Sequence, residues 1–310
     1  METILSFLPK SLYEQLRGMT PMMIDKMEEL RIRVGRPLEV IVGGEPYFFS
    51  YEVTHSDADQ LLNNIGQFSL YTLEEELKRG YITIAGGHRV GLAGKVILEN
   101  GSVKAIRDIS SFNIRVAREK IGAAEPLTSY LYDGEWQHTM LIGAPQTGKT
   151  TILRDIARMI SSGNEKLGIA PQKVGIVDER SEIAGCVHGV PQLEFGTRVD
   201  VLDGCPKAEG MMMMIRSMSP DVLIVDEIGR AADTQAVLEA VNAGIKLMIT
   251  THGHTLDEIK KRPIIAEILK QNIFERFIEL QRSKSGRRSY KVLDAAGGPI
   301  YLGESVNPNV

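Results

Sequence analysis

Residues 139–150 read TMLIGAPQTGKT. An apolar run, Thr139–Gly143, leads directly into a segment that matches G-x-x-x-x-G-K-[ST] in full, and a helical pattern over Thr151–Ile160 follows it. A strand, a glycine-rich loop and a helix in this order are the structural context that the motif requires. The sequence therefore predicts a phosphate-binding loop near the start of an α/β domain.

The loop residues are expected to cradle the phosphates of a nucleotide. Glycines let successive backbone N–H groups turn toward an anion, and the N-terminus of the following helix adds partial positive charge. We expect Lys149 to reach the β- and γ-phosphates and the Thr150 hydroxyl to ligate Mg²⁺. The predicted nucleotide-binding residues of this segment are Gly143, Ala144, Pro145, Gln146, Thr147, Gly148, Lys149, Thr150 and Thr151.

A second apolar run, Val222–Val225, ends in two acids. The carboxyl end of a parallel strand beside a phosphate-binding loop is the place where the metal ion lies. Asp226 is therefore predicted to be the carboxylate on the Mg²⁺ side, acting directly or through water. Glu227 is predicted to be the general base or the group that positions the attacking water. The alternative is that the two acids only cap the next helix.

Two further strand ends would project into the same crevice if the sheet is doubly wound. Val174–Val177 is followed by Asp178 and Glu179, which either share the activation of water or only cap a helix. Leu247–Ile249 is followed by a polar segment in which Thr251 or His252 could hydrogen-bond to the γ-phosphate or to the attacking water. The candidate catalytic residues are therefore Lys149, Asp178, Glu179 and Glu227.

The sequence favours ATP over GTP. A dedicated GTPase usually carries an Asn-Lys-x-Asp segment that reads guanine, and this segment does not occur in the chain. The predicted reaction is therefore the Mg²⁺-dependent hydrolysis of ATP to ADP and phosphate.

The chain of 310 residues, of which 43% are hydrophobic, is long enough for two domains. Residues 1–120 are predicted to form an α+β domain. Ser11–Leu16 and Met22–Leu30 have helical spacing, Leu38–Val42 has strand alternation, and Asn100-Gly101 is a strong hairpin signal. The fold class expected for the whole chain is α/β, with this smaller domain placed first.

The segment 121–137 has no sustained alternation and contains Gly122, Pro126 and Gly134, so it is predicted to be a linker. From residue 138 to residue 310, apolar strands alternate with helical stretches, as is typical of a buried, mostly parallel sheet.

Net charge, cysteine content and hydropathy exclude several classes of protein. The formal net charge of −4 gives no global electrostatic reason to bind nucleic acid, and two cysteines are too few for a disulfide scaffold. No apolar run approaches the roughly 20 residues that span a bilayer, and residues 1–10 lack the pattern of a signal peptide. We therefore expect a cytoplasmic protein without a transmembrane segment.

Several segments resemble the type II and type IV secretion ATPases. Asp178, Glu179 and Glu182 resemble the acidic box of that family, Met214–Asp221 with Glu227 resembles its second acidic motif, and Gly244–His252 resembles its histidine box. The resemblance implies a RecA-like motor domain and a homo-oligomer, in these families a hexamer.

A closer resemblance, to the stage III sporulation protein AA family of endospore-forming bacteria, covers nearly the whole chain. It rests on Arg31–Pro37, Gly86–Gly94, the phosphate-binding loop and Val177–Ile183. It implies a hexameric ATPase in the mother-cell cytoplasm. It also implies membrane-embedded partners, in a complex that links the mother cell to the forespore and whose transport or channel activity ATP hydrolysis would drive.

Residues 78–120 hold nine basic and three acidic residues, a local excess of six positive charges. Secretion ATPases bind nucleotide between their two domains, and N-terminal arginines complete the phosphate site within or between subunits. The resemblance therefore makes Arg89, Arg107 and Arg115 candidates for a cationic lid that stabilises transition-state charge when it closes. The alternative is a solvated basic face of a sheet.

Two other functions remain open on sequence grounds. The basic segment could serve a P-loop ATPase that binds or translocates nucleic acid, although Phe112 is the only aromatic residue between Arg89 and Arg118 to stack on bases. A nucleotide-dependent scaffold with little turnover is the third reading. It predicts that Lys149→Ala and Glu227→Gln leave function intact.

Overall fold

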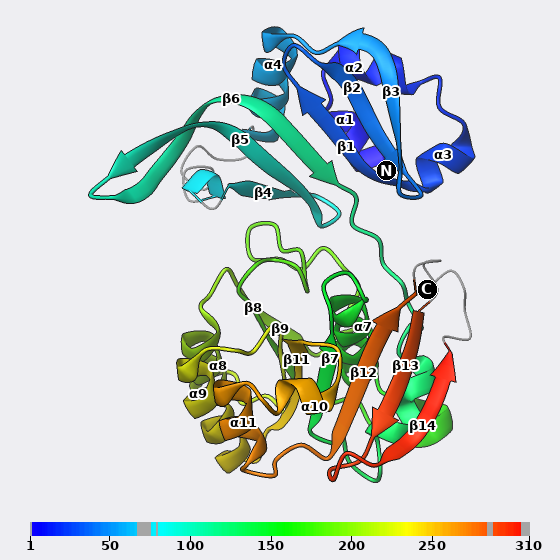
Figure 1. The fold of residues 1–310 in the computed structure, drawn as a ribbon, viewed down its shortest axis with the longest axis vertical. Coiled ribbons are helices and arrows are strands. Elements are labelled where there is room, and N and C mark those ends of the chain that lie inside the picture. Colours follow the sequence, from blue (N-terminus) through cyan, green and yellow to red (C-terminus); the bar gives the residue numbers. More distant parts are fainter. Residues whose placement is uncertain (1, 67–75, 79, 284–287, 305–310) are drawn as a thin grey trace. The chain divides into compact units, whose positions relative to one another are not determined.

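The computed structural model describes residues 2–66, 76–78, 80–283 and 288–304. The chain divides into two compact units, Met1–Arg118 and Glu119–Val310, and each is described by itself. The first is an α+β unit with an antiparallel sheet, and the second contains a mostly parallel sheet (Figure 1). The α/β fold class predicted from the sequence is confirmed.

In the first unit, the described strands form one sheet in the order β3-β2-β1-β6-β5-β4, with every pairing antiparallel. The strands are β1 (Met27–Arg33), β2 (Pro37–Val42), β3 (Glu45–Glu52), β4 (Tyr81–Ile84), β5 (His88–Glu99) and β6 (Ser102–Arg115). The helices are α1 (Glu2–Phe7), α2 (Lys10–Leu16), α3 (Pro21–Asp25) and α4 (His55–Gly66). Alternate residues of the central strands, such as Leu30 and Ile32, meet Leu12 and Leu61 of the helices in one core.

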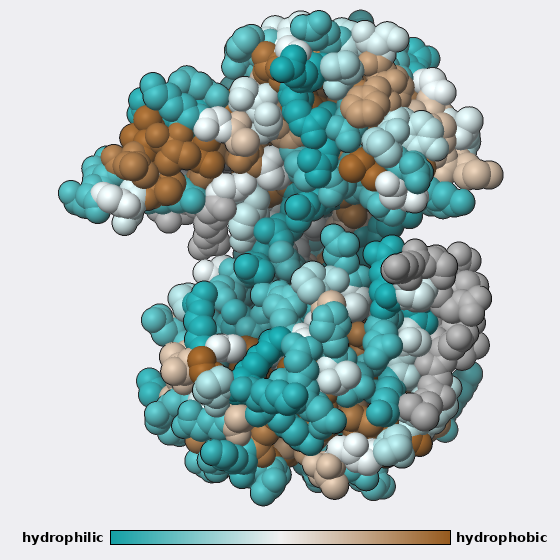
Figure 2. Space-filling view, in the orientation of Figure 1, coloured by the Kyte–Doolittle hydropathy of each residue, from teal (hydrophilic) through white to brown (hydrophobic). Residues whose placement is uncertain are grey.

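The long β5–β6 hairpin holds much of the basic segment. Its turn is the predicted Asn100-Gly101, where both residues have positive φ (51° and 78°), as a tight hairpin turn of this twist requires. Figure 2 shows hydrophobic side chains gathered on this hairpin, and Val96, Leu98 and Val103 are exposed there. The outer part of the hairpin is therefore apolar as well as basic.

In the second unit, the described strands have the order β14-β13-β12-β7-β11-β10-β8-β9. They are β7 (Thr139–Gly143), β8 (Val174–Asp178), β9 (Val199–Asp203), β10 (Val222–Val225), β11 (Lys246–His252), β12 (Arg276–Arg282), β13 (Arg288–Leu293) and β14 (Pro299–Glu304). The pairings from β12 to β9 are parallel, and β13 and β14 are antiparallel additions. The strands predicted at 140–142, 174–177, 222–225 and 247–249 are all present.

Helices cover both faces of this sheet (Figure 1). They are α6 (Thr128–Leu131), α7 (Lys149–Ser162), α8 (Lys207–Ser217), α9 (Ala231–Asn242), α10 (Leu256–Ile259) and α11 (Pro263–Leu269). Leu141 and Ile224 pack toward α7, whereas their neighbours Ile142 and Val225 pack toward α8 and α9. Because both faces are buried, the strands read as continuous apolar runs.

Residues 121–137, expected to be a linker, are instead part of the second unit. Ala124, Leu127 and Trp136 are buried in the core beneath α7. The Asp155 side chain of α7 accepts hydrogen bonds from the backbone N–H groups of Gly122 and Ala124, at 3.1 and 2.8 Å. The segment lacks periodicity because these anchors, rather than a regular helix or strand, hold it in place.

Candidate nucleotide-binding site

Three parallel strands bring the candidate residues to one edge of the second sheet. β11 lies between β7 and β10, with Gly143 of β7 paired with His252 of β11 and Ile249 of β11 paired with Val225 of β10. Parallel strands end at the same edge. The phosphate-binding loop after β7, His252 at the end of β11 and the two acids after β10 therefore lie side by side.

The phosphate-binding loop connects β7 to α7 through two residues with positive φ, Gln146 (64°) and Gly148 (100°). Thr147 holds the turn because its hydroxyl donates to the carbonyl of Ala144 at 2.9 Å. α7 begins at Lys149 and continues through Thr151, so the helix N-terminus points into the loop. This is the arrangement in which backbone N–H groups bind an anion.

Lys149 is buried, and its ammonium group faces the loop. Nζ donates to the carbonyls of Gly143 and Ala144 at 2.8 and 3.1 Å, and it lies 3.2 Å from Nδ1 of His252. Burial lowers the pKa of Lys149, while the charges of Asp226 and Glu227 oppose that shift. The ammonium is held by neutral acceptors that an anionic phosphate would displace.

Thr150 and Asp226 form an oxygen-rich pair beside Lys149. The Thr150 hydroxyl donates to Oδ2 of Asp226 at 2.9 Å, and the Thr250 hydroxyl donates to Oδ1. Mg²⁺ prefers oxygen ligands and is commonly bound by one or two protein groups together with substrate phosphates and water. This pair fits that need. Within the described ranges no cluster of three or more His, Cys, Asp and Glu side chains offers an alternative metal site.

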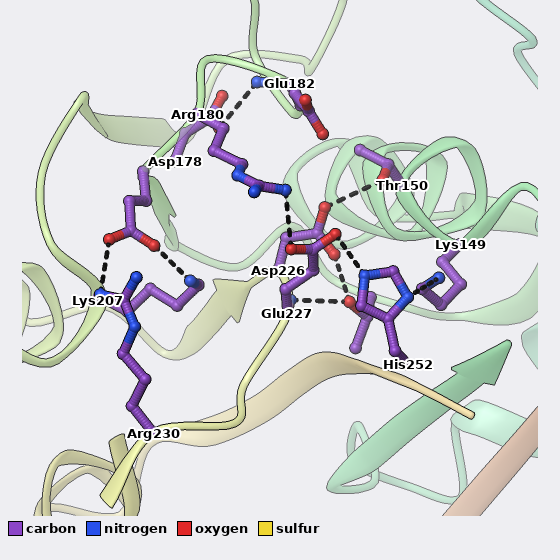
Figure 3. A network of polar contacts seen from close by, with 12 residues as sticks. Lys149, Thr150, Asp178, Arg180, Glu182, Lys207, Asp226, Glu227, Arg230 and His252 are labelled. Atoms are coloured by element: carbon purple, nitrogen blue, oxygen red, sulfur yellow. Dashed lines mark hydrogen bonds and ion pairs between the residues drawn. The ribbon is translucent and has the colours of Figure 1, made fainter. Parts of the chain in front are cut away.

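Glu227 lies at the centre of the polar network in Figure 3. Its Oε1 lies 2.8 Å from Nε2 of His252, and its Oε2 accepts from Arg180 at 3.0 Å. Its backbone has φ of 55°, in the left-handed region that a residue with a side chain seldom adopts, and its N–H donates to the Thr250 hydroxyl at 2.9 Å. Such strain is typical of functional positions, because the surrounding contacts must hold it.

His252 joins the two halves of the site. Its Nδ1 faces Lys149 and its Nε2 faces Glu227, so a continuous polar chain runs from the phosphate-binding loop to the second acid of β10 (Figure 3). A change at the loop that moves Lys149 therefore reaches Glu227 through one imidazole ring.

Asp178, the last residue of β8, faces the turn that follows the strand. Its carboxylate is buried and accepts backbone N–H groups of Glu182, Ile183 and Ala184, each at 2.9 Å. Burial raises the pKa of Asp178 to about 6, although these hydrogen bonds favour the charged form. The side chain fixes the turn after β8.

Glu179 forms ion pairs with two cations. Lys207 at the start of α8 contacts Oε2, and Arg230 before α9 contacts Oε1 at 3.2 Å. Burial raises the pKa of Glu179, but the hydrogen bond from Lys207 and the charges of Lys207, Arg230 and Arg180 outweigh it, so the pKa is lowered. Glu179 ties the ends of β8, α8 and α9 together beside Glu227.

The N-terminal candidates lie in the first unit. Arg89 and Arg115 are directly opposite each other on β5 and β6, and Arg107 lies further along β6. The Arg89 guanidinium stacks over the Tyr81 ring at 4.0 Å, and Arg115 lies 3.7 Å from Glu29.

Sequence reasoning missed the cations around Glu227 and Glu179. Arg180 follows β8, Lys207 begins α8 and Arg230 precedes α9, and only the order of the strands brings them together. Arg180 had one local signal: it lies in the acidic segment 178–182 as a single positive charge.

Comparison with solved structures supports the fold. The chain superposes on the pilus retraction motor PilT with bound ADP with a TM-score of 0.59, at 16% identity, over 88% of this chain and 80% of the other. For the ATPase DotB of Legionella pneumophila the TM-score is 0.58, at 17% identity, over 89% and 82%. At these identities the likeness concerns the fold.

Sequence comparison gives the family. Residues 1–298 match a family model described as "Sporulation stage III, protein AA". The chain is 53% identical over 300 residues to the Stage III sporulation protein AA of Bacillus subtilis (strain 168), and the match covers 97% of each chain. The resemblance inferred from the sequence is confirmed, and this chain belongs to the stage III sporulation protein AA family.

Proposed function

We propose that this protein is a Mg²⁺-dependent ATPase that acts as a secretion-type assembly motor. The observation that carries the proposal is the polar chain Lys149–His252–Glu227, with the Thr150–Asp226 pair beside it, at the carboxyl edge of β7, β11 and β10. A phosphate-binding lysine, a metal-side carboxylate and a carboxylate that can orient water are the parts that ATP hydrolysis needs.

Each residue has a defined task in this reaction. Lys149 leaves the carbonyls of Gly143 and Ala144 and binds the β- and γ-phosphates together with the loop N–H groups. Thr150 and Asp226 would hold Mg²⁺, which would supply positive charge to the phosphates of the nucleotide. Glu227 accepts a proton from the attacking water and holds that water in line with the γ-phosphate.

Arg180 and His252 position Glu227 and do not react themselves. Each contacts one carboxylate oxygen of Glu227 in this structure, and the second lone pair of each oxygen remains to accept a hydrogen bond from water. Phosphate draws Lys149 away from His252, which frees the ring to turn. We assign Asp178 and Glu179 to the structure of this edge, because backbone N–H groups occupy the first and two cations the second.

The cellular role is proposed from the family. The name of the Bacillus subtilis relative places that protein in stage III of sporulation, and the fold is shared with a pilus retraction motor. We propose that this chain is a hexameric ATPase of the mother-cell cytoplasm that drives a transport or channel complex toward the forespore. Membrane-embedded sporulation proteins would be its partners. No helix among the described residues is long and apolar enough to cross a membrane.

The direct test is phosphate release by the purified full-length chain. We expect turnover of ATP that requires Mg²⁺ and stops on chelation with EDTA. Lys149→Ala is expected to abolish both nucleotide binding and turnover, while Lys166→Ala, at an exposed lysine of the same unit, keeps both. Absence of nucleotide binding by the parent protein would contradict the proposal.

The nucleic-acid alternative is tested in the same assay. The outer β5–β6 hairpin exposes the apolar side chains Val96, Leu98 and Val103, and its Lys104 is paired with Glu99 at 2.5 Å. Apolar side chains and a paired lysine do not favour binding to a phosphate backbone. We expect no stimulation of turnover by single-stranded DNA or RNA at low salt. Salt-dependent binding with stimulation would favour the alternative.

A further inference from the structure

Two arginines of the β12–β13 hairpin lie at the same sheet edge as the phosphate-binding loop. β12 is parallel to β7, with Leu280 paired with Gly143, the last residue of β7. Arg282 is two residues further along β12, and its partner across the hairpin is Arg288, the first residue of β13. Both arginines therefore lie past the end of β7, on the side of the sheet edge where the phosphate-binding loop begins.

Arg288 approaches the loop itself. A β-carbon placed on Gly148 would lie 3.5 Å from Cζ of Arg288 and 3.6 Å from its Nε and Nη1. The alternation of β13 explains the direction, because Tyr290 and Val292, on the same face as Arg288, pack in the core that α7 covers. The guanidinium thus lies against the residue that precedes α7.

Arg288 is a half-buried cation that pairs with no carboxylate of the described residues. In the part of the chain that the structure describes, no hydrogen bond or ion pair joins its guanidinium to a carboxylate. Burial lowers the pKa of Arg288, and the charge of Arg282 lowers it further. Partial burial of a charge is costly unless an opposite charge compensates it. The adjacent phosphate-binding loop has the geometry that binds an anion, and a bound phosphate would supply the opposite charge.

We propose that Arg288 binds the α- and β-phosphates of the nucleotide, with Arg282 adding positive charge behind it. Asp226, Glu227 and His252 come from β10 and β11, on one side of β7, whereas Arg288 comes from β13, on the other. The metal and the attacking water belong to the first side. The guanidinium therefore reaches the inner phosphates, which ATP and ADP share, and it forms charge-assisted hydrogen bonds there. The inference rests on the nucleotide site proposed above.

The test measures binding of ATP, ADP, pyrophosphate and adenosine to the full-length chain by calorimetry. Arg288→Ala is expected to weaken ATP, ADP and pyrophosphate alike by about tenfold, the size of one charge-assisted contact. Adenosine binding is expected to be unchanged. Arg288→Lys keeps the charge without the planar fork and should lie between the two. The matched control is Lys291→Ala, which removes one positive charge from the same strand on its opposite face.

Two results would overturn the inference. If Arg288→Ala binds ADP as tightly as the parent does, the guanidinium does not contact the phosphates. Weaker nucleotide binding with unchanged pyrophosphate binding would place Arg288 on the base or ribose instead. Arg288→Gln repeats the measurement should the alanine variant fold poorly. A parent chain that binds no nucleotide contradicts the proposed function, whereas parent-like binding by the variants contradicts only this inference.

Discussion

Asp226 and Glu227 are adjacent in sequence but have different partners. Two hydroxyls, of Thr150 and Thr250, hold Asp226, whereas Arg180 and His252 hold Glu227. Hydroxyls around a carboxylate suit a metal site, and a cation with an imidazole suits a group whose position must be fixed. The different partners of the two acids are consistent with different roles, Asp226 on the Mg²⁺ side and Glu227 beside the attacking water.

Replacing Asp226 by Asn should affect the metal requirement first. We expect the Mg²⁺ concentration for half-maximal turnover to rise and kcat to fall by about 10²-fold, as is typical for loss of one electrostatic group. Metal-free ADP binding should stay near the parental value. Steady-state phosphate release across a Mg²⁺ titration measures this, with Asp257→Asn, at an exposed acid of α10, as the control. An unchanged Mg²⁺ dependence would remove Asp226 from the metal site.

His88 predicts a pH-dependent stability in the first unit. The ring is buried, its Nδ1 accepts the backbone N–H of Ala117 at 2.9 Å, and burial lowers the pKa of His88 from 6.5 to about 4. Because the folded pKa lies below the unfolded one, this contribution is present above pH 6.5 and is lost as pH falls toward 4. It amounts to about 3 kcal/mol at most.

His88→Asn should remove that dependence, because the amide oxygen accepts the same hydrogen bond and does not titrate. Urea unfolding followed by circular dichroism at several pH values between 4 and 7 compares it with the parent and with His55→Asn, at an exposed histidine of the same unit. We expect the difference between His88→Asn and the parent to change with pH and that of His55→Asn to stay constant. Parallel pH profiles would contradict this role of His88.

The part of the site that a single continuous motif forms could be predicted from the sequence. Residues 143–150 are contiguous and have a fixed geometry, so their place at the start of α7 followed from the pattern. The approach of Arg288 to Gly148 was not predictable, because 140 residues separate them and the pairings of β7 with β12 and of β12 with β13 bring them together.

At the level of elements, continuous apolar runs were more informative than weak periodicity. The buried parallel strands were found because a strand covered on both faces needs apolar residues throughout. Met22–Leu30, predicted to be helical, instead contains α3 over Pro21–Asp25 and the start of β1 at Met27. β1 lies between β2 and β6, and this pairing outweighs local helical spacing.

The segment before β7 depends on one side chain of α7. Asp155→Ala would leave the partly buried N–H of Gly122 and the buried N–H of Ala124 without their acceptor, and it would remove one of the two carboxylates that Arg158 contacts. We expect a loss of about 2–4 kcal/mol in the free energy of unfolding of the second unit. Trp136, the only tryptophan and buried beside this segment, reports the transition by its fluorescence in urea.

Asp257→Ala, at an exposed acid of α10, is the matched control for this prediction and should cost less than about 0.5 kcal/mol. Equal unfolding midpoints for the two variants would mean that residues 121–137 are a linker after all.

For the whole molecule, the division into two units predicts that nucleotide binding and ATP turnover can be separated by removing the first unit. Residues 119–310 contain both cores around the second sheet and every described residue of the polar network. If Arg89, Arg107 and Arg115 complete the phosphate site, the fragment 119–310 should bind ADP like the full chain but turn ATP over at least tenfold more slowly. Equal turnover per subunit by the fragment and by the full chain would show that the three arginines take no part in the reaction.

Light scattering with and without ATP and Mg²⁺ should give the mass of a hexamer for the full chain.

ATP turnover by Glu227→Gln, measured together with ATP binding, tests the central claim most directly. Gln keeps the shape and the hydrogen bond to His252 but cannot accept a proton. We predict ATP binding within threefold of the parent and a loss of phosphate release of about 10²- to 10⁴-fold, the usual contribution of a general base. Phosphate release by Glu227→Gln at the parental rate, with ATP bound, would contradict the assignment of Glu227 and the mechanism built on it.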